Sequence, residues 1–130
     1  MTDDLLQAAL EVLPQAYVKY SHFPVAAALR LRDGTIITGV NVENASFGLT
    51  NCAERTALFT AFTQGYRKDD IVEILITTTK DYLISPCGAC RQVMSELMPP
   101  KAWVHMHYGD TLKTVKNEDL LPWAFSEDDL

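Results

Sequence analysis

The residues best suited to chemistry in this sequence are three cysteines and one neighbouring glutamate. Cys87 and Cys90 lie three positions apart, and Cys52 lies two positions before Glu54. Both cysteine segments lead into residues typical of helices, so we expect the sulfurs at two helix N-termini, where the helix dipole and free backbone N–H groups favour thiolate. Thiolates are preferred ligands of zinc. The pattern therefore predicts one zinc ion per chain.

The number of ligands favours a catalytic zinc site over a structural one. A structural site normally takes four protein ligands, whereas three leave one position for water. Zinc lowers the pKa of bound water to about 7, and a nearby carboxylate such as Glu54 can carry the protons that a hydrolysis moves. Two alternatives are three buried thiols that act as small apolar groups, or a structural site completed by a distant histidine. The candidate histidines are His22, His105 and His107.

The cysteine motifs resemble those of a known family of zinc hydrolases. Cys52-Ala53-Glu54 followed by Pro86-Cys87-Gly88-Ala89-Cys90 resembles the zinc deaminase signature, with cysteine in place of the usual histidine. Three flanking segments resemble more narrowly the small homotetrameric cytidine deaminases of nucleoside salvage: Phe23-Pro24-Val25, Asn41-Val42-Glu43-Asn44-Ala45-Ser46-Phe47-Gly48 and Leu121-Pro122-Trp123-Ala124-Phe125. The resemblance covers nearly the whole chain. It implies hydrolysis of cytidine and deoxycytidine to uridine and deoxyuridine with ammonia release, in pyrimidine salvage.

The resemblance assigns the catalytic proton transfers to Glu54. This carboxylate takes a proton from the zinc-bound water, delivers it to ring N3 and later helps to protonate the departing amine. The alternative is that Glu54 only interacts with the helix dipole. Three thiolates and Zn²⁺ carry a net charge of −1, so a positive side chain nearby would restore the acidity of the metal. Arg55 is the candidate, and a solvated helix arginine is its alternative interpretation.

Four further residues are expected to contact the nucleoside. The resemblance makes Phe23 a wall for the pyrimidine and lets Ala53 offer backbone groups to the base. Alternation along an extended strand would point Asn41 and Glu43 to one side, and the resemblance implies that they hold the ribose hydroxyls. Without it, these two residues are most simply solvated residues at a strand end, and Phe23 is ordinary core.

The resemblance also implies a homotetramer whose active sites are shared between subunits. The loop that carries Ala45, Phe47 and Gly48 is expected to approach from another chain, and the ring of Phe125 to reach into a neighbour's pyrimidine pocket. The family often has tyrosine where Phe47 stands, which puts any hydrogen bond from that position in doubt. From the residues alone, Trp123 and Phe125 just before an acidic tail predict a surface that something covers.

Composition limits the class of protein. The 130 residues, 48% hydrophobic and 22% charged, suit a single domain spanning residues 1–130, with no apolar run long enough for a membrane. The net charge of −6 and eleven scattered basic residues disfavour a nucleic-acid polymer as partner. Three cysteines are too few for a disulfide scaffold, and no secretory signal pattern opens the chain, so we expect a cytoplasmic protein with reduced thiols.

Apolar patterning predicts strands that alternate with helices, as in an α/β domain. A first helix is expected over residues 3–19, with a kink or early end at Pro14. Ser85 and Pro86 are expected as cap and first residue of the cysteine-bearing helix. The expected strands are 25–31, 35–41, 71–78, 103–108 and 112–115, with a brief last helix over 118–121. The resemblance implies a three-layer α/β/α fold with a five-stranded mixed sheet.

Two competing functions remain open. One is deamination of a cytosine-containing antibiotic by a related enzyme of similar length. The other is a zinc-binding interaction module without catalysis, for which an exchangeable water and turnover would be unexpected. Ammonia release from cytidine would separate all three hypotheses.

Overall fold

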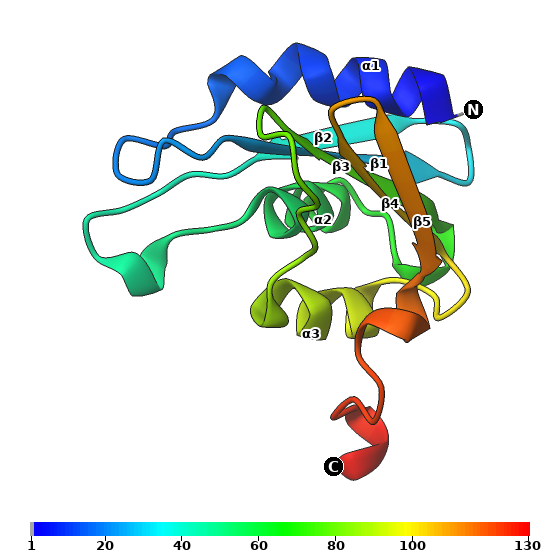
Figure 1. The fold of residues 1–130 in the computed structure, drawn as a ribbon. Coiled ribbons are helices and arrows are strands. Elements are labelled where there is room, and N and C mark those ends of the chain that lie inside the picture. The colour runs from blue at the N-terminus through cyan, green and yellow to red at the C-terminus, as the bar shows by residue number, and fades with distance from the viewer. Residues whose placement is uncertain (1) are drawn as a thin grey trace.

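The computed structural model describes residues 2–130 and contains a central sheet with helices on both faces (Figure 1). Helix α1 (Thr2–Val12) covers one face, and helices α2 (Ala53–Thr63) and α3 (Gly88–Leu97) cover the other. These layers confirm the expected α/β/α arrangement. None of the helices within the described residues is both long and apolar enough to cross a membrane.

The sheet has five strands in the order β2-β1-β3-β4-β5. The strands are β1 (Val25–Leu31), β2 (Ile36–Val40), β3 (Ile71–Thr78), β4 (Trp103–Tyr108) and β5 (Thr111–Lys116). Strands β3 and β4 are parallel, and the other three neighbouring pairs are antiparallel, so the sheet is mixed as expected. Helix α3 makes the crossover that a parallel pair requires.

The structure decides between the expected outcomes at the end of α1 and corrects the expectation at the start of α3. Helix α1 ends at Val12, and a 3-10 turn (Leu13–Gln15) follows it, so Pro14 stops the helix early instead of bending it. The expectation that Ser85 caps the cysteine-bearing helix is wrong. Cys87 is the N-cap of α3 and its sulfur accepts the backbone N–H of Cys90 at 3.4 Å. A sulfur acceptor takes the place of the hydroxyl because Cys87 keeps an extended backbone immediately before Gly88.

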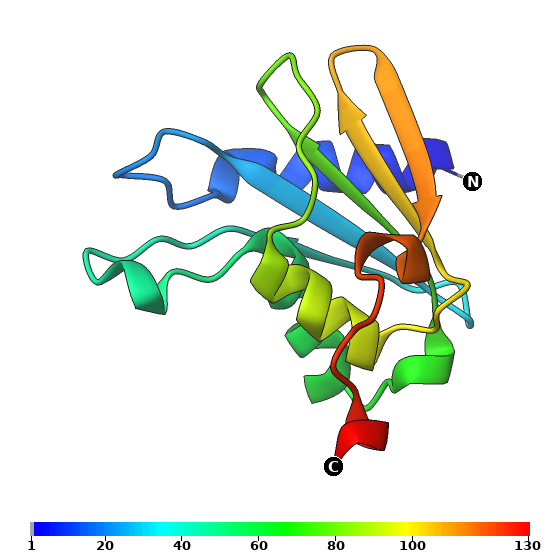
Figure 2. The same ribbon diagram turned by 60° about the horizontal axis from the view of Figure 1, so that its bottom comes forward.

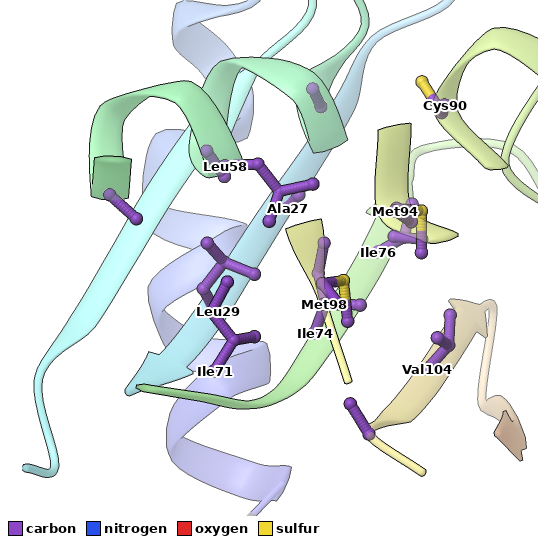
Figure 3. Close-up of a cluster of buried hydrophobic side chains, with 14 of the residues drawn as sticks. Ala27, Leu29, Leu58, Ile71, Ile74, Ile76, Cys90, Met94, Met98 and Val104 are labelled. Atoms are coloured by element: carbon purple, nitrogen blue, oxygen red, sulfur yellow. The ribbon is translucent and has the colours of Figure 1, made fainter. Parts of the chain in front are cut away.

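The larger hydrophobic core lies between the sheet and the two helices of the cysteine-bearing face (Figure 3). Leu29, Ile74 and Ile76 from the strands meet Leu58 of α2 and the methionines of α3, Met94 and Met98. Each fully buried side chain of this kind stabilises the fold by about 1.5–3 kcal/mol. Cys90 belongs to the same cluster, so one candidate ligand is held by the core itself.

Helix α2 lies unusually close to strand β2 at Gly39. A Cβ atom built on this glycine would stand 2.5 Å from the backbone nitrogen of Ala57 and 2.8 Å from the carbonyl oxygen of Ala53. Both are backbone atoms of the helix, which cannot rotate away as a side chain can. The absence of a side chain at Gly39 therefore sets the position of the N-terminal half of α2, the half that carries Glu54.

Two segments extend away from the layers. Residues 41–52 form an arm between β2 and α2, with a 3-10 turn (Phe47–Leu49) at its end, and both views show it projecting from the body (Figures 1 and 2). The C-terminal residues leave a 3-10 turn (Asn117–Leu120) and run beyond α3 (Figure 1). Their projection leaves large apolar side chains exposed at the tips of both segments.

Candidate metal centre

The fold brings the three cysteines together. Their Sγ atoms all lie within 4.8 Å of one another, and those of Cys52 and Cys87 are 3.7 Å apart. Two sulfurs that each lie about 2.3 Å from a tetrahedral zinc ion are about 3.8 Å apart. The donor set therefore fits zinc in both chemistry and spacing.

Helix N-termini position all three sulfurs. Cys52 is the N-cap of α2, Cys87 is the N-cap of α3, and Cys90 lies in the first turn of α3. The start of each helix presents backbone N–H groups and the positive end of the helix dipole to the sulfurs, and both stabilise the thiolate form of cysteine. Because α2 and α3 pack against the same face of the sheet, their N-termini meet at one point (Figure 2).

The histidines are not part of this cluster. His105 contacts Glu73 at 2.7 Å and Thr114 at 2.8 Å on the other face of the sheet, and His107 contacts Thr77 at 2.8 Å. Within residues 2–130 the group of potential metal ligands contains the three cysteines alone. A fourth protein ligand is therefore missing from the cluster, as a catalytic zinc site requires.

The electrostatics of the sulfurs favour a cation. A hydrogen bond from Cys90, together with Arg55, lowers the pKa of Cys52 to about 5. The hydrogen bond to Cys52, burial and the nearby Glu54 raise the pKa of Cys90. Ionisation of Cys52 therefore makes ionisation of Cys90 less favourable, and a divalent cation between the sulfurs would offset this repulsion.

Arg55 lies in contact with this cluster. Its Nη2 atom donates to Cys52 Sγ at 3.4 Å, and this contact raises the pKa of the guanidinium. Its Nε atom is buried and has no hydrogen-bond partner within the described residues. The contact places a permanent positive charge beside the thiolates, as the charge argument from the sequence predicts, and argues against a solvated surface role.

Glu54 is buried beside the sulfurs, with 4% of its surface exposed. Burial, followed by the charge of Cys52, raises the pKa of Glu54 to about 7. The residue lines a cavity of about 160 Å³ that also contains Cys52, Cys87 and Ala53, with Asn41, Val25, Ile84 and Ser85 completing the wall. Two candidate metal ligands, Cys52 and Cys87, and a buried carboxylate therefore share one cavity.

Asn41 and Glu43 lie in different cavities of the chain. Asn41 lines the cysteine cavity and holds the segment before β1, since its Oδ1 atom accepts from Val25 N and its Nδ2 atom donates to the Phe23 carbonyl, both at 2.9 Å. Glu43 accepts the backbone N–H groups of Tyr20 and Ser21 at 3.1 and 3.0 Å. A contact with the Ser21 hydroxyl completes its set.

The second cavity measures about 390 Å³ and lies between the arm and the loop that carries Tyr20 and Ser21. Its lining is Tyr20, Ser21, Glu43, Phe47 and Thr50. Ala45 and Gly48 are exposed on the same arm. The fold of one chain therefore places these expected substrate contacts away from the cysteine cavity.

Phe23 and Phe125 also lie outside the lining of the cysteine cavity. Tyr82 packs edge-on against the Phe23 ring, with centroids 6.1 Å apart, and Lys80 Nζ stands 5.5 Å from its centre. Phe125 is 58% exposed, and its carbonyl accepts a hydrogen bond from Gln92 at 2.9 Å. The C-terminal segment thus rests on α3 with the aromatic ring turned largely outward.

Sequence reasoning missed three residues around the site. Ile84 and Ser85 line the cysteine cavity, and Arg91 binds the loop to which they belong. The position of Ile84 and Ser85 just before Cys87 could have indicated that both residues lie next to the candidate metal ligands. No local pattern distinguishes Arg91 from a solvated helix arginine, because its partners include a carbonyl far along the chain.

The chain is similar to known proteins along nearly its whole length. Residues 1–106 match the family model described as the cytidine and deoxycytidylate deaminase zinc-binding region. The chain belongs to this family. Cytidine deaminase from Halalkalibacterium halodurans is 47% identical over 97% of the chain and 95% of that protein. The blasticidin-S deaminase of Bacillus cereus is 28% identical over 95% of the chain and 91% of its own length.

The fold supports the same family membership. The crystal structure of a cytidine deaminase from Burkholderia pseudomallei superimposes with a TM-score of 0.93, at 45% identity, over 96% of this chain and 99% of that one. The five-stranded mixed sheet and the helix layers are therefore those of a cytidine deaminase. As a member of this family the chain is a zinc-binding hydrolase, and its cysteine cluster is the possible metal site.

Proposed function

We propose that this chain is a cytidine deaminase that hydrolyses cytidine and deoxycytidine to uridine and deoxyuridine with release of ammonia, in pyrimidine salvage. One observation carries the proposal: the buried Glu54 lines a cavity with Cys52 and Cys87 at the meeting point of two helix N-termini, and the sulfur of Cys90 lies within 4.8 Å of both other sulfurs. The similarity of the whole chain to cytidine deaminases directs this chemistry to a cytosine nucleoside.

In this mechanism Cys52, Cys87 and Cys90 would hold one zinc ion. Bound zinc supplies a Lewis acid that makes water a better nucleophile near neutral pH. The carboxylate of Glu54 accepts one proton of the attacking water and passes it to N3 of the base. It then takes the second proton from the new C4 hydroxyl and delivers it to the amine, which leaves as ammonia. Arg55 offsets the negative charge of the thiolates through its contact with Cys52.

The nucleoside is bound by groups around this cavity. Asn41 and the backbone of Ala53 face the cysteines from the cavity wall, and Phe23 is tied to Asn41 through its carbonyl. We assign the pyrimidine wall to Phe23 and the ribose hydroxyls to Asn41 and Glu43. Among the described residues 2–130, no lysine or arginine lines the cavity, so a 5′-phosphate finds no cationic partner in this wall and nucleotides are poor substrates.

We further propose that four chains assemble and complete each other's sites. The cavity of about 160 Å³ is smaller than the roughly 300–1,000 Å³ of typical ligand pockets. Phe47 is 78% exposed and Trp123 is fully exposed, both on projecting segments. Trp123 also has a backbone φ of 60°, a costly conformation for a large residue. A neighbour that receives the arm with Ala45, Phe47 and Gly48, and the ring of Phe125, would bury these surfaces and enlarge the pocket.

Two more general assignments accompany this proposal. We propose that residues 1–130 act as one domain, because the metal centre joins both cysteine-bearing helices to a common core. The three cysteines form no disulfide, which supports a reducing cytoplasmic location.

A substrate panel with a proton-transfer variant tests the activity. Purified protein should release ammonia from cytidine and deoxycytidine, and much more slowly from deoxycytidine 5′-phosphate and blasticidin S. Glu54→Gln should retain zinc while losing about two or more orders of magnitude in turnover. The matched control is Glu11→Gln, which replaces an exposed carboxylate of α1. Its zinc content and turnover should equal those of the wild-type protein. Wild-type turnover in the Glu54 variant would exclude Glu54 as the proton carrier, and wild-type protein inactive on both nucleosides would refute the function.

Light scattering on active fractions tests the assembly. We expect a mass near four times 14.5 kDa. Deletion from Trp123 onward should raise the KM for cytidine while zinc content stays at one per chain, because no proposed ligand is removed. A fully active monomer would rule out a shared site.

A further inference from the structure

The side chain of Arg91, a residue of α3, binds two separate segments next to the candidate metal centre. Arg91 follows Cys90 in α3, and its Nε atom donates to the Pro86 carbonyl at 2.7 Å. Its Nη2 atom donates to Ser85 Oγ at 2.9 Å, and its Nη1 atom donates to the Leu120 carbonyl at 2.9 Å. One guanidinium therefore binds the loop before Cys87 and the segment that leads to the C-terminus.

The loop before Cys87 depends on this side chain. Residues 81–86 have no regular secondary structure, and within the described residues 2–130 their hydrogen bonds both come from Arg91. The same loop supplies Ile84 and Ser85 to the wall of the cysteine cavity. The contact at the Pro86 carbonyl holds the backbone one residue before Cys87. The helix holds the backbone that follows Cys87, so this candidate ligand is fixed from both sides along the chain.

The C-terminal segment is held by the same helix turns. The Leu120 carbonyl that Arg91 binds ends the last 3-10 turn before Phe125. The neighbouring residue, Gln92, donates to the Phe125 carbonyl at 2.9 Å. A change in the orientation of α3's first turn therefore moves both the metal-binding loop and the base of the C-terminal segment.

We propose that Arg91 is a positioning residue that holds the Cys87 loop in register with Cys90 and couples this loop to residues 117–122. The inference rests on the proposed function only in that the three cysteines bind zinc. Its physical basis is the rigid planar fork of the guanidinium, which presents several N–H donors in fixed directions. Lysine carries the same charge on a flexible stem with a compact head, and lacks the fixed fork that reaches acceptors in both segments.

The decisive measurement is the rate of zinc release from the folded holoprotein to a colorimetric chelator. Arg91→Lys should accelerate release by about 10-fold or more, within the range found when partners of metal-binding groups are removed. The kcat for cytidine should fall by about 10-fold, because the loop that Arg91 holds carries the proposed ligand Cys87. Arg91→Gln should show a larger effect of the same kind.

Two controls separate positioning from general damage. Arg32 also donates to a backbone carbonyl, that of Asp69 at 2.6 Å, but it lies at the end of β1 that is far from the cysteines. The Arg32→Lys protein should therefore release zinc at the wild-type rate. Gln92→Ala cuts the contact with Phe125 but none with the Cys87 loop, and should also leave the release rate unchanged. Circular dichroism establishes that each variant is folded; if Arg91→Gln does not fold, the milder Arg91→Lys decides.

Hydrogen exchange tests the coupling independently of catalysis. Amides in residues 85–90 and in residues 117–122 should both exchange faster in Arg91→Lys, while strands β1 and β3 keep wild-type protection. Wild-type zinc release in folded Arg91→Lys would overturn the positioning role, and unchanged exchange at 117–122 would overturn the coupling. Wild-type protein that binds zinc but does not deaminate cytidine would refute the proposed function and leave this inference standing.

Discussion

The substitution Gly39→Ala tests whether close packing of α2 on β2 positions the metal centre. The added Cβ would lie 2.5 Å from Ala57 N, whereas ordinary contact begins at 3.4 Å, so the helix and strand must separate by about 0.9 Å (3.4 − 2.5). Ala57 N and Ala53 O are both backbone atoms, and neither can yield alone. Because Cys52 and Glu54 lie at the start of this helix, they must move relative to the two cysteines of α3.

The expected effects follow from that displacement. Metal–ligand distances tolerate deviations of about 0.2 Å, so a shift of about 0.9 Å exceeds the tolerance of a zinc site several-fold. A misplacement of about 1 Å can reduce turnover by about 100-fold, and overpacking typically lowers the free energy of unfolding by about 1–3 kcal/mol. The smaller entropy of the unfolded alanine chain offsets only about 0.4–1 kcal/mol of this loss. We therefore expect Gly39→Ala to lower stability, zinc affinity and kcat/KM for cytidine together.

Urea unfolding, a zinc titration and steady-state kinetics on the same preparation measure these effects. Thr38→Ala is the matched control, since alternation along β2 turns Thr38 toward α1 and away from α2. The control should change activity little. A Gly39→Ala protein with wild-type stability and kinetics would refute the reasoning, and one that is destabilised but fully active would show that the strand yields and α2 stays in place.

Three further predictions concern single side chains. Cys87→Ala should lose stoichiometric zinc and destabilise the surrounding fold, measured by metal analysis and thermal unfolding; full zinc content would exclude Cys87 as a ligand. Arg55→Gln should keep zinc and lower turnover by about 10-fold, and unchanged turnover would show that charge compensation is unnecessary. Although burial raises the pKa of Glu73, hydrogen bonds from Arg30 and His105 outweigh it and lower that pKa below 4.5. The carboxylate therefore contributes stability that is present above pH 4.5 and lost as the pH falls through the lowered pKa. Glu73→Gln should weaken this acid dependence in urea unfolding, and an unchanged pH profile would contradict the assignment.

Local signals in the sequence determine much of the fold. Strands β1, β3 and β4 begin and end at the predicted residues, because stretches rich in apolar, aromatic or β-branched residues are recognised from neighbours along the chain. The stop at Pro14 has the same local origin. The cysteine spacing predicts a metal site because three sulfurs near two helix starts are rare outside such sites. Family resemblance supplied the mixed sheet and the roles of the substrate contacts, which local patterning does not contain.

Packing between distant segments decides the rest. Asn41 and Glu43 are two positions apart, yet they reach different cavities, because each is bound by a different part of the preceding loop. Ser85 was predicted as a helix cap and instead bonds Arg91, while the sulfur of Cys87 accepts the helix N–H. Arg91 finds its third acceptor 29 positions along the chain, and Gly39 matters only because α2 lies against it. Residue type and spacing limit what chemistry a side chain can do, but which distant backbone atoms lie within about 3 Å of it is known only when the layers have packed.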